Sequence, residues 1–322
     1  SIQKDASVGI VTHSGQDIAT MGSFFKQIYR YSHARPYRHN ENLWPYVKIA
    51  RGEGGEIAAL WYKYRPVPIV PLSELRNSCR GPALLTATGP SVKALRFENI
   101  PAMPAIGVNG AYCLHRQGDF HFYVIVDMGF IDNRPEIVRD VIQRPALTLF
   151  TTVHGVARIL DRFGQAAIGC RLAIVEDAAC KIYRPRIDSG ALWDHYCREN
   201  GVEFCIANRT LGFSQDIRCG IFDAGTVAYW ALQIIAYLGF RQLFIAGLDM
   251  NNFHQPRFYE TEQDRLPTFL ADKVESLVIP AFRHAGAVMQ KQQIAIKNLS
   301  PHSAIGSDIF EKVDGNVYFQ QA

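Results

Sequence analysis

The chain has 322 residues, of which 48% are hydrophobic and 20% are charged, so it can bury a full core and is not disordered by composition. This length fits one large α/β domain with an extension, or two modest domains, because single cores stop growing at roughly 250–300 residues. Seven cysteines without a Cys-x-x-Cys pair, and no secretory signal before them, predict a reducing, cytoplasmic compartment. The same pattern argues against a disulfide framework or a zinc ribbon.

The excess of positive charge lies in the first quarter of the chain. Residues 1–80 carry eleven Lys and Arg against six Asp and Glu, whereas the remainder carries 23 against 24. Basic and aromatic side chains alternate there, and Glu41 is the only acid between Lys26 and Arg51. Two interpretations stay open: a footprint on an anionic membrane or glycolipid, and a solvated basic face. We expect no nucleic-acid partner, because no zinc-finger spacing or RNA-binding signature accompanies the charge.

Strand and helix patterns alternate after residue 80. Proline-punctuated residues 65–71 and the sequence CRGP at 79–82 predict a boundary between an N-terminal extension, 1–80, and a main domain, 81–322. Apolar runs predict strands at 83–88, 105–109, 121–127, 146–151, 171–176, 203–208, 240–249 and 293–300. Helical patterns fall at 134–143, 153–163, 224–239 and 267–285. This alternation predicts an α/β fold with a doubly wound, mainly parallel sheet.

Residues 224–240 contain no charge, and their length is near the lower limit for a membrane-spanning helix. Thr226, Gln233 and two glycines interrupt the apolar run, which leads directly into a predicted strand. We therefore expect a core helix packed on the sheet, and only peripheral membrane contact. The terminal GNVYFQQA resembles the remnant of a protease site, and we assign it no function.

Small and polar residues follow the predicted strands or precede the apolar helix. They form six loops: 89–91, 109–110, 127, 223–226, 249–252 and 300–303. Each loop alone is equally an ordinary turn or helix cap. Because ligands bind beyond the carboxyl ends of parallel strands, their shared position predicts a nucleotide site.

Missing motifs narrow the class of enzyme. No Gly-x-Gly-x-x-Gly follows a strand, and there is no Walker loop, which argues against a dinucleotide oxidoreductase or a P-loop enzyme. Asp-x-Asp, His-Glu-x-x-His and Gly-x-Ser-x-Gly are also missing. We therefore expect a nucleotide enzyme without a bound metal or other cofactor.

Four segments in order carry a resemblance: TATGPSVKALRFENIPAMPAIGVNGAY, FYVIVDMGF, DAGTVAYWALQIIAYLGFRQLFIAGLDM and KNLSPHSAI. They resemble the bacterial sialyltransferases of lipooligosaccharide and related enzymes that transfer 3-deoxy-D-manno-octulosonic acid (Kdo) or other ulosonic acids to lipopolysaccharide core. The resemblance covers roughly residues 82–305. It implies a Rossmann-like, sialyltransferase-like variant of the GT-A fold with a short lid at about 251–272.

The family's reaction gives the expected partners. A CMP-activated ulosonic acid would be the donor and a glycolipid the acceptor, at an anionic membrane on the inner face of the inner membrane. A homo-oligomer is left open. The resemblance transfers donor-binding positions to Thr88, Gly89, Pro90, Ser91, Asn109, Asp127, Ala224, Gly225, Thr226, Asp249, Pro301, His302 and Ser303. Thr88 and Asp127 stand where the family has Asn.

The family's lid carries two tyrosines that steady the phosphate and a following His that acts as general base. Here Tyr259, helped by Arg257, is the candidate substitute for the second tyrosine. The position of the family His falls near Thr268, so His254 and Asp272 are the candidate bases.

The missing His favours Kdo over sialic acid as the transferred sugar. Two alternatives remain open. A pterin pyrophosphokinase-like enzyme would share the Gly-Pro-Ser loop but would need Mg²⁺, and a non-catalytic module would bind a nucleotide or glycan without turnover.

Overall fold

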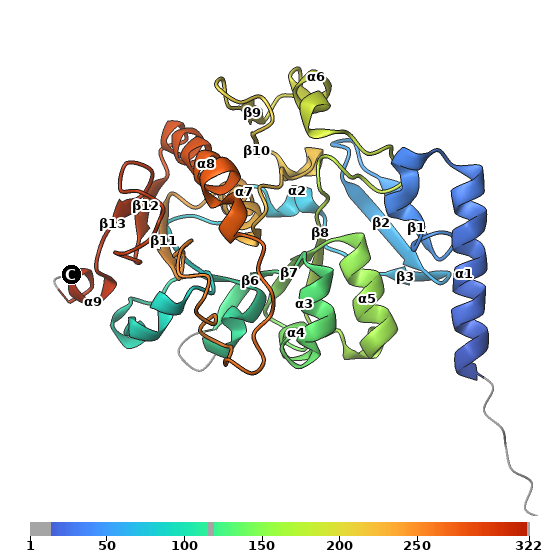
Figure 1. Ribbon diagram of the computed structural model, residues 1–322, viewed down its shortest axis with the longest axis horizontal. Coiled ribbons are helices and arrows are strands. Elements are labelled where there is room, and N and C mark those ends of the chain that lie inside the picture. The colour runs from blue at the N-terminus through green and yellow to red at the C-terminus, as the bar shows by residue number, and fades with distance from the viewer. Residues whose placement is uncertain (1–13, 115–118, 321–322) are drawn as a thin grey trace, which may run out of the picture.

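The computed structural model describes residues 14–114 and 119–320, and its centre is an eight-stranded sheet in which neighbouring strands are parallel (Figure 1). The strand order is β13-β12-β11-β4-β5-β6-β7-β8. These strands are β4 (Pro82–Thr86), β5 (Ala105–Val108), β6 (Phe120–Val124), β7 (Thr148–Thr151), β8 (Arg171–Ile174), β11 (Gln242–Ala246), β12 (Ala295–Asn298) and β13 (Glu311–Lys312). The predicted α/β class with a mainly parallel sheet is confirmed.

Helices cover both faces of this sheet, as its runs of buried apolar residues require. One face is packed by α2 (Leu72–Leu75), α7 (Val227–Leu238) and α8 (Ile279–Lys291). The opposite face is packed by α3 (Met128–Asn133), α4 (Pro135–Ile142) and α5 (Val153–Phe163) (Figure 1). The result is a three-layer arrangement with two separate apolar layers.

The sheet reverses its direction of growth at β4. From β4 the chain builds outward through β5 to β8, and it then returns to place β11 on the other side of β4, with Ile245 opposite Leu85. Connections that leave two adjacent strands in opposite directions open a crevice at the carboxyl ends of those strands. The fold therefore creates a ligand site between the loops after β4 and β11.

The predicted apolar helix is α7, and eleven of its twelve residues are buried. Its buried Gln233 accepts hydrogen bonds from the backbone N–H groups of Ser214 and Phe222, at 2.9 and 3.0 Å. Its amide nitrogen donates to the carbonyl oxygens of Phe222 and Tyr229. Gln233 thus ties the preceding loop to the helix. In the part of the chain that the structure describes, no helix is long and apolar enough to cross a membrane.

The N-terminal region packs beside β8. It contains α1 (Ser14–Ser32) and an antiparallel sheet of β1 (Val47–Arg51), β2 (Ile57–Tyr62) and β3 (Arg65–Val67), whereas residues 1–13 lie outside the described part. Val47 and Leu60 belong to the same apolar cluster as Ile125 of the main unit. The N-terminal region therefore shares a core with the rest of the described chain, and a domain division at residue 80 stays a prediction.

Three sequence-based expectations are corrected. Residues 203–208 do not join the main sheet, because β9 (Val202–Phe204) pairs antiparallel with β10 (Gly212–Ser214), beyond α6 (Leu192–Tyr196). The helix expected over 267–285 begins at α8, with a π-helical stretch just before it.

The third correction concerns the terminal segment. α9 (Gly315–Tyr318) belongs to the fold, because the rings of Tyr318 and Phe319 pack on Phe244 of β11. Only Gln321 and Ala322 of this segment lie outside the described residues.

Candidate functional site

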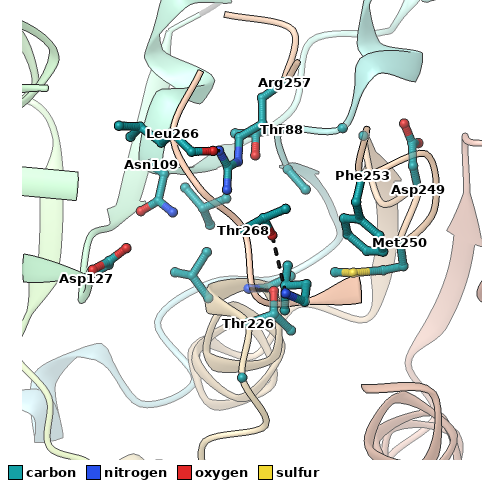
Figure 2. A pocket seen from close by; sticks show the side chains of 18 of the residues that line it. Thr88, Asn109, Asp127, Thr226, Asp249, Met250, Phe253, Arg257, Leu266 and Thr268 are labelled. Carbon is teal, nitrogen blue, oxygen red and sulfur yellow. Dashed lines mark hydrogen bonds between the residues drawn. The ribbon is translucent and has the colours of Figure 1, made fainter. Parts of the chain in front are cut away.

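A cavity of about 550 Å³ lies at the carboxyl ends of β4, β5 and β11. Residues 87–90 after β4 form one wall, and the segment that follows β11 covers the opening. Figure 2 shows Thr88, Asn109, Asp127 and Thr226 around one central space, with Arg257 reaching into it. The cavity therefore occupies the position at which the strand order predicts a ligand.

Asp249 holds the loop after β4 in place. Its carboxylate accepts hydrogen bonds from the Ser91 backbone N–H, at 2.9 Å, and from the Ser91 hydroxyl. Ser91 also bonds the hydroxyl of Ser300 at 2.9 Å, so three loops distant in sequence are joined. A Cβ at Gly89 would lie 2.5 Å from Asp249 Oδ2 and 2.5 Å from the Gly247 carbonyl oxygen. Only glycine fits this close approach.

Asn109 follows β5 in a left-handed backbone conformation, with φ of 45°. Asparagine tolerates this conformation better than most residues. Its Oδ1 atom is buried and has no hydrogen-bond partner among the described residues, although the side chain lines the cavity. A buried acceptor without a donor is costly, so this oxygen is a candidate contact for a ligand.

The segment between β11 and the π-helical turn is organised by a buried carboxylate instead of by regular structure. Glu260 accepts from the Arg257 backbone N–H at 3.0 Å, from the Arg257 guanidinium at 2.8 Å and from the Leu266 N–H at 3.2 Å. Three cationic residues of the segment, Arg257, Arg265 and Lys273, line the cavity. The cover over the cavity is thus basic.

The cavity brings together nine of the residues singled out from the sequence. They are Thr88, Gly89, Pro90, Asn109, Asp127, Gly225, Thr226, Asp249 and Arg257. The other eight lie outside its lining: Ser91, Ala224, Pro301, His302, Ser303, His254, Asp272 and Tyr259.

The structure does not bring the candidate bases to the cavity. His254 is exposed, and its backbone carbonyl accepts from Arg265. Asp272 is also exposed, in the short turn before α8. The ring of Tyr259 packs on Gly110 and edge-on against Phe130, and burial raises the pKa of its phenol well above the usual value.

The loop after β12 makes hydrogen bonds to neighbouring loops. Ser303 donates to the Leu248 carbonyl oxygen at 2.5 Å and accepts from the Ile305 N–H at 3.1 Å. The carbonyl of exposed His302 accepts from the Asn251 side chain. These bonds hold the loops after β11 and β12 together. The loop after β12 therefore supports the cavity indirectly, through the loop after β11.

Asp177 and Asp223 also line the cavity. Asp223 belongs to the predicted loop 223–226, whereas Asp177 is not among the residues predicted from the sequence. Asp223 accepts from the Trp230 indole N–H at 2.8 Å, and the N-cap of α7 is Thr226. Burial raises the pKa of Asp177 to about 6, and nearby Asp223 adds to the shift. The available sequence signal was that Asp177 directly follows the apolar run 171–176.

The comparisons with known proteins agree on one class of enzyme, the transferases. Residues 200–315 match the family model described as "3-deoxy-D-manno-octulosonic acid transferase WaaZ". A Salmonella typhimurium protein named "Probable 3-deoxy-manno-octulosonic acid transferase" is 25% identical over 259 residues, which are 74% of this chain and 90% of that protein. An Escherichia coli protein of the same name is 24% identical over 249 residues, 73% of this chain and 83% of that protein.

The chain is a glycosyltransferase. These matches confirm the predicted resemblance to the sialyltransferase-like glycosyltransferases of lipopolysaccharide. Among solved structures, the Campylobacter jejuni sialyltransferase CstII with cytidine-5'-monophosphate is 12% identical and matches with a TM-score of 0.40 over 73% of this chain and 85% of that chain. A complex of the sialyltransferase CST-II with a trisaccharide acceptor and CMP matches with a TM-score of 0.35, at 12% identity over 73% of this chain and 86% of that one.

Proposed function

We propose that this chain is a metal-independent transferase that moves an ulosonic acid from a CMP donor to a core sugar of lipopolysaccharide or lipooligosaccharide. Kdo is the foremost candidate for the transferred sugar, and sialic acid is the next. An acceptor hydroxyl oxygen bonds to the anomeric carbon, the bond from that carbon to the phosphate oxygen breaks, and its electron pair leaves with CMP. The relatives named as probable Kdo transferases support the choice of sugar.

The observation that carries the proposal is the unpartnered Oδ1 of Asn109 in a cavity at the reversal point of the sheet. An amino or hydroxyl group of a nucleoside would supply the missing donor. The glycine loop beside it lets a phosphate or sugar approach the backbone. These are the groups that a CMP moiety presents.

The basic cover supports a donor with two negative charges. Arg257, Arg265 and Lys273 line the side of the cavity formed after β11. A CMP-linked ulosonic acid carries a phosphate and a sugar carboxylate. Positive groups fixed beside the departing phosphate stabilise the charge that develops there as the bond breaks.

The test is thermal stabilisation of the purified full chain by CMP, compared with UMP, AMP and GMP, with and without EDTA. A ligand that binds only the folded state raises the melting temperature according to its affinity. We expect a CMP-selective shift that survives EDTA, followed by CMP release from CMP-Kdo with a core acceptor. A shift with purine nucleotides and Mg²⁺ alone would favour the pyrophosphokinase alternative. CMP binding without turnover of any CMP-ulosonic acid would favour the binding module.

A matched pair of variants locates the binding. Asn109→Gly keeps the left-handed backbone accessible but removes the amide, and it should abolish most of the CMP shift. Asn77→Gly is the control, because Asn77 is exposed, has φ of 51° and lies outside the cavity lining. Equal CMP shifts in the two variants would argue against a nucleotide at Asn109.

We also propose that α1 contacts an anionic membrane. Met21, Phe24, Ile28 and Tyr31 are 57%, 59%, 37% and 93% exposed, and their spacing places them on one side of the helix. Arg35 and Arg38, just beyond α1, are exposed and basic. An apolar face flanked by cations fits the surface of an acidic bilayer.

Vesicle sedimentation checks this contact. Wild-type protein should sediment with vesicles that contain phosphatidylglycerol and not with pure phosphatidylcholine, and Phe24→Ser with Tyr31→Ser should lower the bound fraction severalfold. A concentration-dependent dimer that these substitutions abolish, without lipid binding, would assign the face to a second copy instead.

A further inference from the structure

Carboxylates line the cavity at several places, and most of them have a role within the fold. Asp249 holds the loop after β4, Glu260 organises the cover, and Asp127 caps α3 by accepting from the Gly129 N–H. Asp177 and Asp223 are the remaining acids of the described lining. Asp177 follows β8, and Asp223 precedes α7.

The backbone fixes the position of Asp177. It forms a parallel bridge with Ile221, which holds the end of β8 beside the loop leading to Asp223. Its Oδ1 accepts from the Ala179 N–H at 2.8 Å. Among the described residues, no hydrogen bond is made to its Oδ2. One carboxylate oxygen of this lining residue is therefore anchored, and the other is left without a partner in the described part of the chain.

We propose that Asp177 is the general base of the transfer, a role that rests on the function proposed above. As the acceptor oxygen bonds to the anomeric carbon, its proton passes to Oδ2 of Asp177. The electron pair of the breaking bond leaves with the phosphate of CMP. Asp223 is a positioning residue, whose charge beside Asp177 strengthens that base.

The surroundings of Asp177 fit this role. Burial is the main cause that raises its pKa to about 6, and the charge of Asp223 acts in the same direction. Arg186 and His39 oppose the shift. A base with a pKa close to the working pH combines an ionised form with strong proton affinity.

Two further titratable groups lie near Asp177. The thiol of Cys180 and the phenol of Tyr196 both have a raised pKa, chiefly through burial, and the Asp177 charge adds to both shifts. Both groups are therefore neutral at the pH at which Asp177 is ionised. Asp223, Arg186 and His39 are therefore the ionisable neighbours that shift the pKa of Asp177.

The experiment uses the full chain and measures CMP release from CMP-Kdo against pH, together with stabilisation by CMP. Wild-type kcat/KM should fall about tenfold per pH unit below about pH 6. Asp177→Asn should lose at least about a hundredfold in turnover and should still be stabilised by CMP. Its kcat/KM should no longer fall below about pH 6, which is the acidic limb of the wild-type profile. Asp223→Asn should move the limb to lower pH, because the neighbouring negative charge is gone. Asp188→Asn, an exposed acid on the same loop, is the matched control.

The outcomes separate the two proposals. Wild-type protein that releases no CMP from any CMP-ulosonic acid overturns the proposed function and the base with it. Active wild type with equally active Asp177→Asn overturns the base alone. Loss of both turnover and the CMP shift in Asp177→Asn assigns the residue to the fold, and loss of turnover in Asp223→Asn alone moves the base to Asp223.

Discussion

At the residue scale, the cavity is lined by polar groups whose burial lowers the stability of the fold. Asp177 is buried enough that its pKa rises to about 6, from an ordinary value near 4. Between about pH 4 and pH 6 the folded chain holds a proton on this carboxyl that the unfolded chain has lost. Stability therefore falls as pH rises through this window, and the loss is complete above pH 6.

Asp177→Asn removes this cost. We expect the variant to be about 3 kcal/mol more stable than wild type at pH 7.5 and to lose this advantage by about pH 4. Urea unfolding at several pH values measures the difference. Asp188→Asn should show no such pH dependence, and an Asp177→Asn variant that is less stable than wild type at pH 7.5 would show that the carboxylate stabilises the fold.

The cavity residues that follow β4 and β5 were better placed from the sequence than those of the segment after β11. Gly89 and Asn109 follow strongly apolar strands, so the apolar pattern and their position after it were enough to predict that they lie at this edge of the sheet. Tyr259 was selected by analogy with lid tyrosines, but nothing in its neighbourhood in the sequence reveals that it packs on Gly110. Asp177 was missed because its position beside Asp223 arises from a bridge to Ile221, far away in the chain.

At the element scale, α7 shows how an almost wholly apolar helix is fixed in one rotation. Gln233 satisfies two backbone N–H groups of the preceding segment from inside the core. Gln233→Leu would leave both donors buried without acceptors, each at a cost of about 1–3 kcal/mol.

We therefore expect Gln233→Leu to lower the free energy of unfolding by about 2–5 kcal/mol, although leucine has about the same helix propensity and is more apolar. Denaturant unfolding checks this value. Gln290→Leu, at an exposed position of α8, makes the same chemical change and should stay within about 0.5 kcal/mol of wild type. Equal stability of the two variants would contradict the bonding role of Gln233.

Helix and strand periodicity predicted most central elements, including the full extent of α5, because those elements are decided by local apolar spacing. The lid and the 203–208 strand could not be placed in this way. The lid depends on the buried Glu260, and β9 pairs only with β10, so both are set by contacts outside the periodic pattern.

At the scale of the whole molecule, ion pairs join the N-terminal region to the main unit, and two of them differ sharply in exposure. Arg51 forms a bidentate pair with Glu176 and also donates to the Ile182 carbonyl, and its side chain is only 17% exposed. The Lys63 pair with Asp161 is about half exposed at both ends. Buried charges that lose a partner are costly, whereas exposed pairs contribute little.

Arg51→Ala should destabilise the chain by about 3–5 kcal/mol, because it leaves the Glu176 carboxylate buried and unpaired. Lys63→Ala should change stability by less than about 1 kcal/mol. Both values follow from chemical denaturation monitored by circular dichroism and tryptophan fluorescence. Separate transitions in the two signals would show that the N-terminal region unfolds independently, in contrast to the shared apolar cluster.

The position of β4 in the middle of the sheet has a consequence for synthesis on the ribosome. β4 is the first strand of the main sheet to emerge, yet one of its two neighbours, β11, is made about 160 residues later. Until then one edge of an apolar strand stays open, and such edges favour pairing between chains. The yield of folded protein from heterologous expression should therefore depend on the rate of translation and on chaperone supply, even for variants of this chain whose folded state is stable.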